Sequence, residues 1–227
     1  MADHSAAGET ATSPLDVRQL TRELNEFRTV RPLRSGIELA ITLVPFLALF
    51  GLMLFTVQAG YYLGLLLTPV TGLFLLRLFI IQHDCGHNAF FRNRKLNDWT
   101  GRLLGVLTLT PYDVWRQTHA IHHASTGNLD RRGIGDLPVQ TLAEYRAAPR
   151  RKRLVYRIYR NPFFLFGLAP AWLFFVQNRV PLGLMRSGRR YWISAMATNL
   201  GIAALVGAGI YLSAGLPVLF LILPMTL

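Results

Sequence analysis

Two long stretches without a charged side chain constrain this sequence more than any other feature. Residues 39–76 contain no Asp, Glu, Lys or Arg over 38 positions, and residues 191–227 contain none over 37. A helix needs about 20 mostly apolar residues to cross the hydrocarbon core of a membrane. Both stretches are long enough for this, and we therefore predict an all-α, polytopic membrane helical bundle.

We expect two transmembrane hairpins. The first has spans near residues 37–57 and 61–81, and the second has a span near 191–213 and the start of another at 216–227. The final 12 residues amount to about 18 Å of helix at about 1.5 Å per residue, whereas the membrane core is about 30 Å thick. We therefore expect the last helix to be incomplete and the sequence to be truncated within it.

Basic residues are unevenly distributed, and their positions predict the orientation. The formal net charge is +12, with fourteen Lys and Arg in residues 82–160, four in residues 179–190 and five in residues 1–36. Because basic segments next to membrane spans stay in the cytoplasm, we expect the N-terminus and both basic regions to be cytoplasmic. The uncharged residues 161–178 have basic residues at both ends, so we interpret them as a re-entrant or interfacial segment, with a full span as the alternative.

The sequence divides into a tail and a membrane domain. In residues 1–35 we expect a cytoplasmic N-terminal tail with an amphipathic helix on the membrane surface, because Val17, Leu20 and Leu24 recur at helical spacing. Residues 36–227 form the expected membrane domain.

Five of the six histidines occur in two groups, which are His83 and His87, and His119, His122 and His123. Residues at i, i+3 and i+4 share one face of a helix, so the rings of each group can converge on a metal ion. Imidazole binds zinc, copper, iron and nickel, so the ligand type alone does not select the metal. Five nitrogens are more than one tetrahedral zinc ion takes.

The sequences around these histidines carry a resemblance to a known family. HDCGH at residues 83–87 and HAIHH at residues 119–123 resemble the first two histidine boxes of the membrane fatty acid desaturases. HNAFF at residues 87–91 and the segment 123–133 are similar to the acyl-lipid omega-6 (Δ12-type) branch and its bacterial members, and the resemblance covers about residues 36–227. Family members carry a third box of HxxHH type, but no histidine follows His123 here. We therefore expect no desaturation by residues 1–227 alone.

The resemblance implies a chemistry and a set of ligands. It implies a non-haem di-iron centre of two Fe ions at the cytoplasmic face of the membrane, with O₂ as co-substrate. The reaction would place a double bond in the acyl chain of a lipid or thioester, using electrons from an external donor such as a ferredoxin. A bacterial inner membrane is the expected location. The proposed iron ligands are His83, His87, His119, His122 and His123.

Metal-binding histidines usually donate their second ring N–H to a carboxylate or a carbonyl. The candidates for such carboxylates are Asp84, Asp113, Asp130 and Asp136. Because Asp84 points about 100° away from His83 on a helix, we expect it to support a histidine of the other group.

The segment 146–160 contains seven basic residues and no acidic one. In a soluble chain this would suggest nucleic acid, but beside an apolar segment we expect contact with lipid headgroups or with an acidic electron carrier. Two alternative functions remain open from the sequence. One is a related di-iron hydroxylase or ketolase. The other is a metal transporter with a histidine-rich cytoplasmic loop, which is disfavoured because Arg77 is the only ionisable residue inside the predicted spans apart from Glu38 at the edge of the first.

Overall fold

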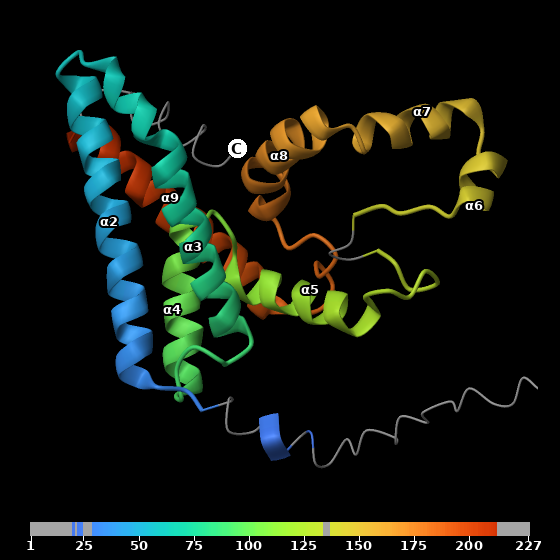
Figure 1. The fold of residues 1–227 in the computed structure, drawn as a ribbon, viewed down its shortest axis with the longest axis horizontal. Coiled ribbons are helices and arrows are strands. Elements are labelled where there is room, and N and C mark those ends of the chain that lie inside the picture. The colour runs from blue at the N-terminus through green and yellow to red at the C-terminus, as the bar shows by residue number, and fades with distance from the viewer. Residues whose placement is uncertain (1–19, 21, 25–28, 134–136, 213–227) are drawn as a thin grey trace, which may run out of the picture.

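The computed structural model describes residues 20, 22–24, 29–133 and 137–212. Every regular element within these residues is a helix (Figure 1). The predicted all-α class is therefore confirmed for the described part of the chain. The predicted helix at residues 216–227, and most of the predicted amphipathic helix in the tail, lie outside the described residues.

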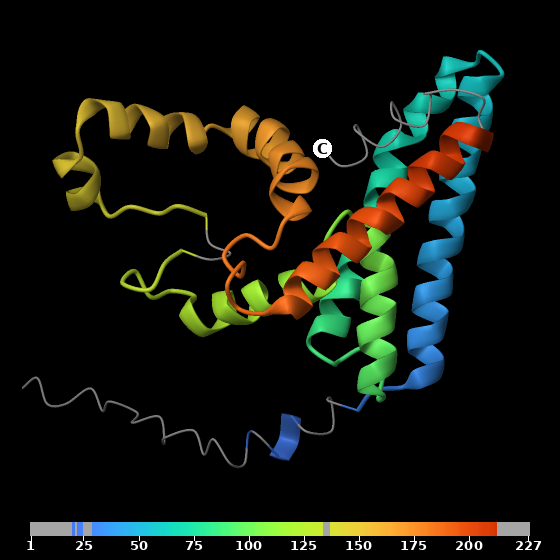
Figure 2. The same ribbon diagram turned by 180° about the vertical axis from the view of Figure 1, so that it is seen from behind.

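Four helices lie side by side as a bundle (Figures 1 and 2). Three segments are long and apolar enough to cross a membrane, namely Pro32–Gln58, Tyr62–Gly86 and Arg189–Tyr211. The fourth helix of the bundle is shorter and more polar, and it packs against α3 and α9. The bundle consists of α2 (Pro32–Gln58), α3 (Thr68–Gly86), α4 (Arg94–Leu107) and α9 (Arg189–Leu212).

Proline and glycine shape the first hairpin. Pro32 starts α2, where its missing N–H leaves no hydrogen bond unmade. The chain turns after Gln58 at Gly60, whose φ of 81° suits a residue without Cβ. It continues through the 3-10 helix η2 (Tyr62–Leu67) into α3. Pro69 lies within the candidate span Tyr62–Gly86, in the first turn of α3, which a proline tolerates.

The remaining helices form an extension from the bundle (Figures 1 and 2). α5 leaves the bundle after α4, and the chain returns through short helices before α9 begins. The uncharged segment 161–178 contains a π-helix and two short helices, and no helix of membrane-spanning length is found in it among the described residues. These elements are α5 (Tyr112–Ser125), α6 (Leu142–Ala147), α7 (Arg150–Tyr159), η3 (Phe164–Leu168), α8 (Ala169–Phe175) and η4 (Gln177–Arg179).

Buried polar side chains hold the turn between α4 and α5. The side chain of Gln82, in α3, is fully buried. Its Oε1 accepts a hydrogen bond from Thr108 Oγ1 at 2.5 Å, and its Nε2 donates to the carbonyl of Thr110 at 3.4 Å. On the other side of the turn, the carbonyl of Leu109 accepts from Asn178 Nδ2 at 3.2 Å and from the guanidinium of Arg179. The start of α5 is therefore tied to α3 and to η4 together.

The packing of this turn predicts the effect of a single methyl group. A Cβ on Gly105 would lie 2.4 Å from the carbonyl oxygen of Thr110, which is backbone and cannot rotate away. We expect Gly105→Ala to destabilise the protein by about 1–3 kcal/mol, as overpacking does, and to lower its thermal midpoint in detergent. Gly51→Ala is the matched control, because a Cβ there meets no atom within 4 Å. Equal midpoints for the two variants would contradict the close approach.

Candidate metal centre

Two helices present the histidines to each other. His83 lies in the last turn of α3, and His87 is the residue that caps this helix, with its backbone N–H donating to the carbonyl of His83 at 3.1 Å. The other three histidines lie in the second half of α5. The chain can turn sharply after His87 because Asn88 adopts a φ of 55°, a left-handed conformation that asparagine tolerates better than most residues.

Four of the five predicted ligands form one cluster. The ligand atoms of His83, His87, His119 and His123 all lie within 4.8 Å of one another. His119 is central, since its Nε2 lies 3.1 Å from Nε2 of His87 and 3.0 Å from Nε2 of His123. Imidazole nitrogens lie about 2.0–2.1 Å from a bound ion, so two of them at right angles are about 3.0 Å apart. The cluster therefore fits a shared metal ion.

His122 stands apart from this cluster. Its ring centroid is 6.1 Å from that of His119 and 5.9 Å from that of His123. Its Nε2 lies 3.4 Å from Oγ1 of Thr126, and the residue lines a cavity beside the cluster. Adjacent positions in a helix point in different directions, which separates His122 from His123.

The protonation of the cluster favours metal binding. Burial, together with the neighbouring imidazoles of His83 and His123, lowers the pKa of His119 to about 4. Burial and the same neighbours also lower the pKa of His87. A neutral imidazole has a lone pair for a metal ion. At neutral pH both rings are therefore ready to act as ligands.

Trp115 supports the cluster, and the sequence did not assign it a role. Its ring stacks on His119 with the centroids 4.5 Å apart and the planes inclined by 15°. It also packs edge-on against Phe79 at 5.4 Å, and a Cβ on Gly86 would lie 2.9 Å from the indole. Trp115 precedes His119 by four residues, and this spacing predicts that the two side chains share one face of the helix. The spacing does not predict that this face packs against α3.

Asp84 contacts its own neighbour. Its Oδ1 lies 3.2 Å from Nδ1 of His83, so the expectation that it would support a histidine of the other group is wrong. The two positions differ by about 100° around the helix, but the side-chain conformations bring the carboxylate and the ring together near the end of α3. A carboxylate at Nδ1 leaves Nε2 of His83 as the ring atom for a metal.

Two of the other predicted carboxylates, Asp113 and Asp130, make no hydrogen bond to a histidine within the described residues. Asp113 is held by Arg102, whose Nε and Nη2 each donate to it at 3.0 Å. Asp130 is exposed in the loop after α5, and it makes no hydrogen bond to a histidine within the described ranges. Asp136 lies outside the described residues.

A buried tyrosine joins the two histidine helices. Tyr112, the first residue of α5, is fully buried, and its hydroxyl lies 3.0 Å from the carbonyl oxygen of Cys85 in α3. The same hydroxyl lies 3.3 Å from Oδ1 of Asp98 in α4, which also accepts from Arg116 at 2.8 Å. This network connects α3, α4 and α5, and it meets α3 at Cys85, between His83 and His87 in the sequence.

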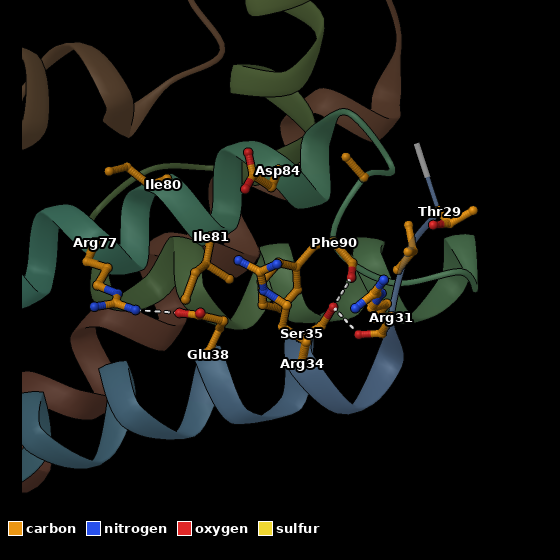
Figure 3. Close-up of a pocket in the computed structure, with 12 residues that line it drawn as sticks. Thr29, Arg31, Arg34, Ser35, Glu38, Arg77, Ile80, Ile81, Asp84 and Phe90 are labelled. Carbon is orange, nitrogen blue, oxygen red and sulfur yellow. Dashed lines mark hydrogen bonds and ion pairs between the residues drawn. The ribbon is translucent and has the colours of Figure 1, made fainter. Parts of the chain in front are cut away.

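Two cavities near the metal centre have different linings. One, of about 440 Å³, touches His119 and His122 and is lined by apolar residues that include Val114, Leu173 and Leu182 and by the polar residues Thr118, Gln177 and Asn178. The other, of about 560 Å³, lies between α2 and α3 and reaches the metal centre only at Asp84 (Figure 3).

Comparison with known proteins identifies the family. A family model described as fatty acid desaturase matches residues 59–227. The chain belongs to the fatty acid desaturase family. A protein named fatty acid desaturase, from Bacillus subtilis, is 42% identical over 191 residues, which cover 84% of this chain and 54% of the Bacillus protein. This desaturase-family chain therefore spans about half the length of that relative, and the resemblance seen in the sequence is confirmed.

Relatives with shorter matches have more specific names. The sn-1 oleoyl-lipid 12-desaturase of Synechocystis sp. is 32% identical over 92 residues, 40% of this chain and 26% of that protein. The sn-1 acyl-lipid omega-3 desaturase (ferredoxin) of the same organism is 48% identical over 50 residues, 22% of this chain and 14% of that protein. No solved structure matches the chain.

The tyrosine network predicts a measurable loss of stability. Tyr112→Phe keeps the buried ring but removes the hydroxyl that bridges α3 and α4. Asp98 keeps its bond from Arg116 and the Cys85 carbonyl keeps its bond from the backbone N–H of Asn88, so only the hydrogen bonding of the hydroxyl is lost. We therefore expect a cost of about 0.5–1.5 kcal/mol and a lower thermal midpoint in detergent. Tyr211→Phe, on a side chain that is 85% exposed, should leave the midpoint unchanged. An unchanged midpoint for both variants would show that the bridge does not stabilise the fold.

Proposed function

We propose that this chain belongs to a membrane-bound, non-haem di-iron fatty acid desaturase and carries histidine ligands of its metal centre. The reaction is the O₂-dependent introduction of a double bond into an acyl chain. The observation that carries the proposal is the cluster of His83, His87, His119 and His123, formed between α3 and α5 at the end of a helix that is apolar enough to span a membrane. Membership of the fatty acid desaturase family supports it.

The chain's own residues would bind and orient the metal. The four clustered histidines would hold one iron ion, with Asp84 orienting His83 through Nδ1 and Trp115 supporting the ring of His119. His122, which faces the neighbouring cavity, is the proposed fifth ligand and belongs to the second iron. Bound non-haem iron supplies the oxidation chemistry with O₂, which the side chains themselves do not provide.

The cavity beside the histidines suits an acyl chain. His119 and His122 line it together with the apolar side chains of Val114, Leu173 and Leu182, and polar side chains such as Gln177 also reach it. The apolar part of this lining would hold a hydrocarbon chain near the metal by apolar contact. The Synechocystis relatives are named for acyl-lipid and oleoyl-lipid substrates, and we propose an acyl lipid rather than a thioester here.

The electron donor and the location belong to the same proposal. The name of one Synechocystis relative includes ferredoxin, and we propose a ferredoxin-like donor that approaches from the cytoplasm. The basic helix α7 is a candidate for docking this donor or for contact with lipid headgroups. A bacterial inner membrane, with the metal centre on its cytoplasmic side, is consistent with the three helices of membrane-spanning length.

The geometry predicts an order among the histidine ligands. We load the chain with Fe²⁺ without oxygen, desalt it and count iron by mass spectrometry. His119→Ala should lower the iron affinity at least tenfold, because its Nε2 lies beside those of two other ligands. His122→Ala should keep the ion that the other four hold, and His4→Ala is the control with full iron content. If His122→Ala loses as much iron as His119→Ala, the assignment of four ligands to one ion is wrong.

The reaction itself is tested on products. The full-length gene product is expressed in a host with saturated membrane lipids, and the fatty acids are analysed by gas chromatography and mass spectrometry. We expect acyl chains that are two mass units lighter, from the loss of two hydrogens. Chains that are sixteen mass units heavier would instead identify a hydroxylase. Metal accumulation in vesicles without either product would identify a transporter.

A further inference from the structure

The cavity between α2 and α3 has no role in the chemistry proposed above. The described residues that line it include no histidine, and the lining residue Asp84 is the one that contacts His83. The cavity lies where the uncharged part of the first hairpin ends, since Glu38 is the last charged residue before the 38 uncharged positions and Arg77 is the first after them. The cavity therefore lies at the level where lipid headgroups meet the helices.

The positive charges around this cavity exceed the negative ones. Arg77 forms an ion pair with Glu38 across the two helices (Figure 3). Arg31 and Arg34 also line the cavity, and neither guanidinium forms an ion pair with a residue in the described part of the chain. The first turn of α2 contains no acidic residue. Two arginine side chains are therefore available for an anion.

The walls of the cavity are held in place by the protein. Ser35 is buried, and its hydroxyl donates to the carbonyl of Phe90 at 2.5 Å, which joins α2 to the loop after His87 (Figure 3). Arg92 Nε donates to the carbonyl of Val30 at 3.0 Å, which holds the segment before α2 over the cavity. A site that is formed before the ligand arrives loses less conformational entropy on binding.

Apolar side chains also line the cavity. They are Ile80 and Ile81 of α3 and Phe90 of the loop after it, and Ile80 remains half exposed. The cavity thus presents guanidinium groups at its polar end and hydrocarbon at the other. A free phosphate would use only the first of these features, whereas a phospholipid would use both.

We propose that this cavity binds a membrane phospholipid, with its phosphate between Arg31 and Arg34 and the upper part of an acyl chain against Ile80 and Phe90. Guanidinium groups are well suited to phosphate oxygens because they donate several hydrogen bonds in a fixed plane. The site is separate from the acyl cavity at His119 and His122. It needs neither iron nor turnover, so its failure and the failure of the proposed desaturase function can be told apart.

The test compares two double variants in detergent. Binding of dioleoyl phosphatidylglycerol is measured by native mass spectrometry on residues 1–227. Each basic side chain near an anionic headgroup contributes about fivefold, so Arg31→Gln with Arg34→Gln should weaken binding at least tenfold. The control removes the same charge at and just before the start of α9, where Arg186 and Arg189 are exposed and do not line the cavity, and Arg186→Gln with Arg189→Gln should change binding by less than twofold. Equal losses in both double variants, or none in either, would overturn the site.

A third variant distinguishes a lipid from free phosphate. Ile80→Trp fills the apolar end of the cavity and leaves every charge in place. We expect it to weaken phosphatidylglycerol binding while inorganic phosphate still competes weakly, and dioleoylglycerol, which lacks the phosphate, should not bind. Unchanged lipid binding in Ile80→Trp, or inorganic phosphate that binds as tightly as the lipid, would overturn the proposal of a phospholipid. The iron content and thermal midpoint of each variant check that the fold is intact.

Discussion

The geometry of the metal centre depends on the hydrogen bonds of one buried side-chain amide in α3, that of Gln82. Gln82 is fully buried beside helices that face lipid, where an unpaired polar group costs about 1–3 kcal/mol. Its partners are Thr108 and Thr110, which form the turn that starts α5. The hydroxyl of Tyr112 adds a second link to α3, at the carbonyl of Cys85, about one helical turn after Gln82. These bonds hold α5 so that its histidines face those at the end of α3.

The same arrangement explains why the two cavities have different character. The apolar cavity opens where α5 meets the segment that returns to the bundle, and histidines form one of its sides. The charged cavity lies between α2 and α3, where arginines gather at the end of the uncharged hairpin (Figure 3). Asp84 of α3 lines the charged cavity and also contacts His83 of the metal cluster. One helix therefore connects a membrane-facing surface to the histidine centre.

The membrane helices and the two histidine groups could be predicted from patterns of residues that are close together in the sequence. Charge-free length predicts membrane helices because the bilayer core has a fixed thickness, and the spacing of the histidines predicts that the rings of each group share a helix face. The network of Asp98, Arg116 and Tyr112 could not be read in this way, because its members come from two helices and meet only through packing. The same holds for Asp113, whose partner Arg102 lies on the preceding helix.

The sequence by itself determined the helical class, the apolar spans and the histidines that can bind metal, since each depends on residues close together in the chain. Only the tertiary structure decided which of these histidines meet. It brought His83 and His87 to His119 and His123, left His122 at the cavity, and turned Asp84 toward its own neighbour. The physical reason is that the angle between α3 and α5 is set by buried hydrogen bonds between distant residues, which no local spacing contains.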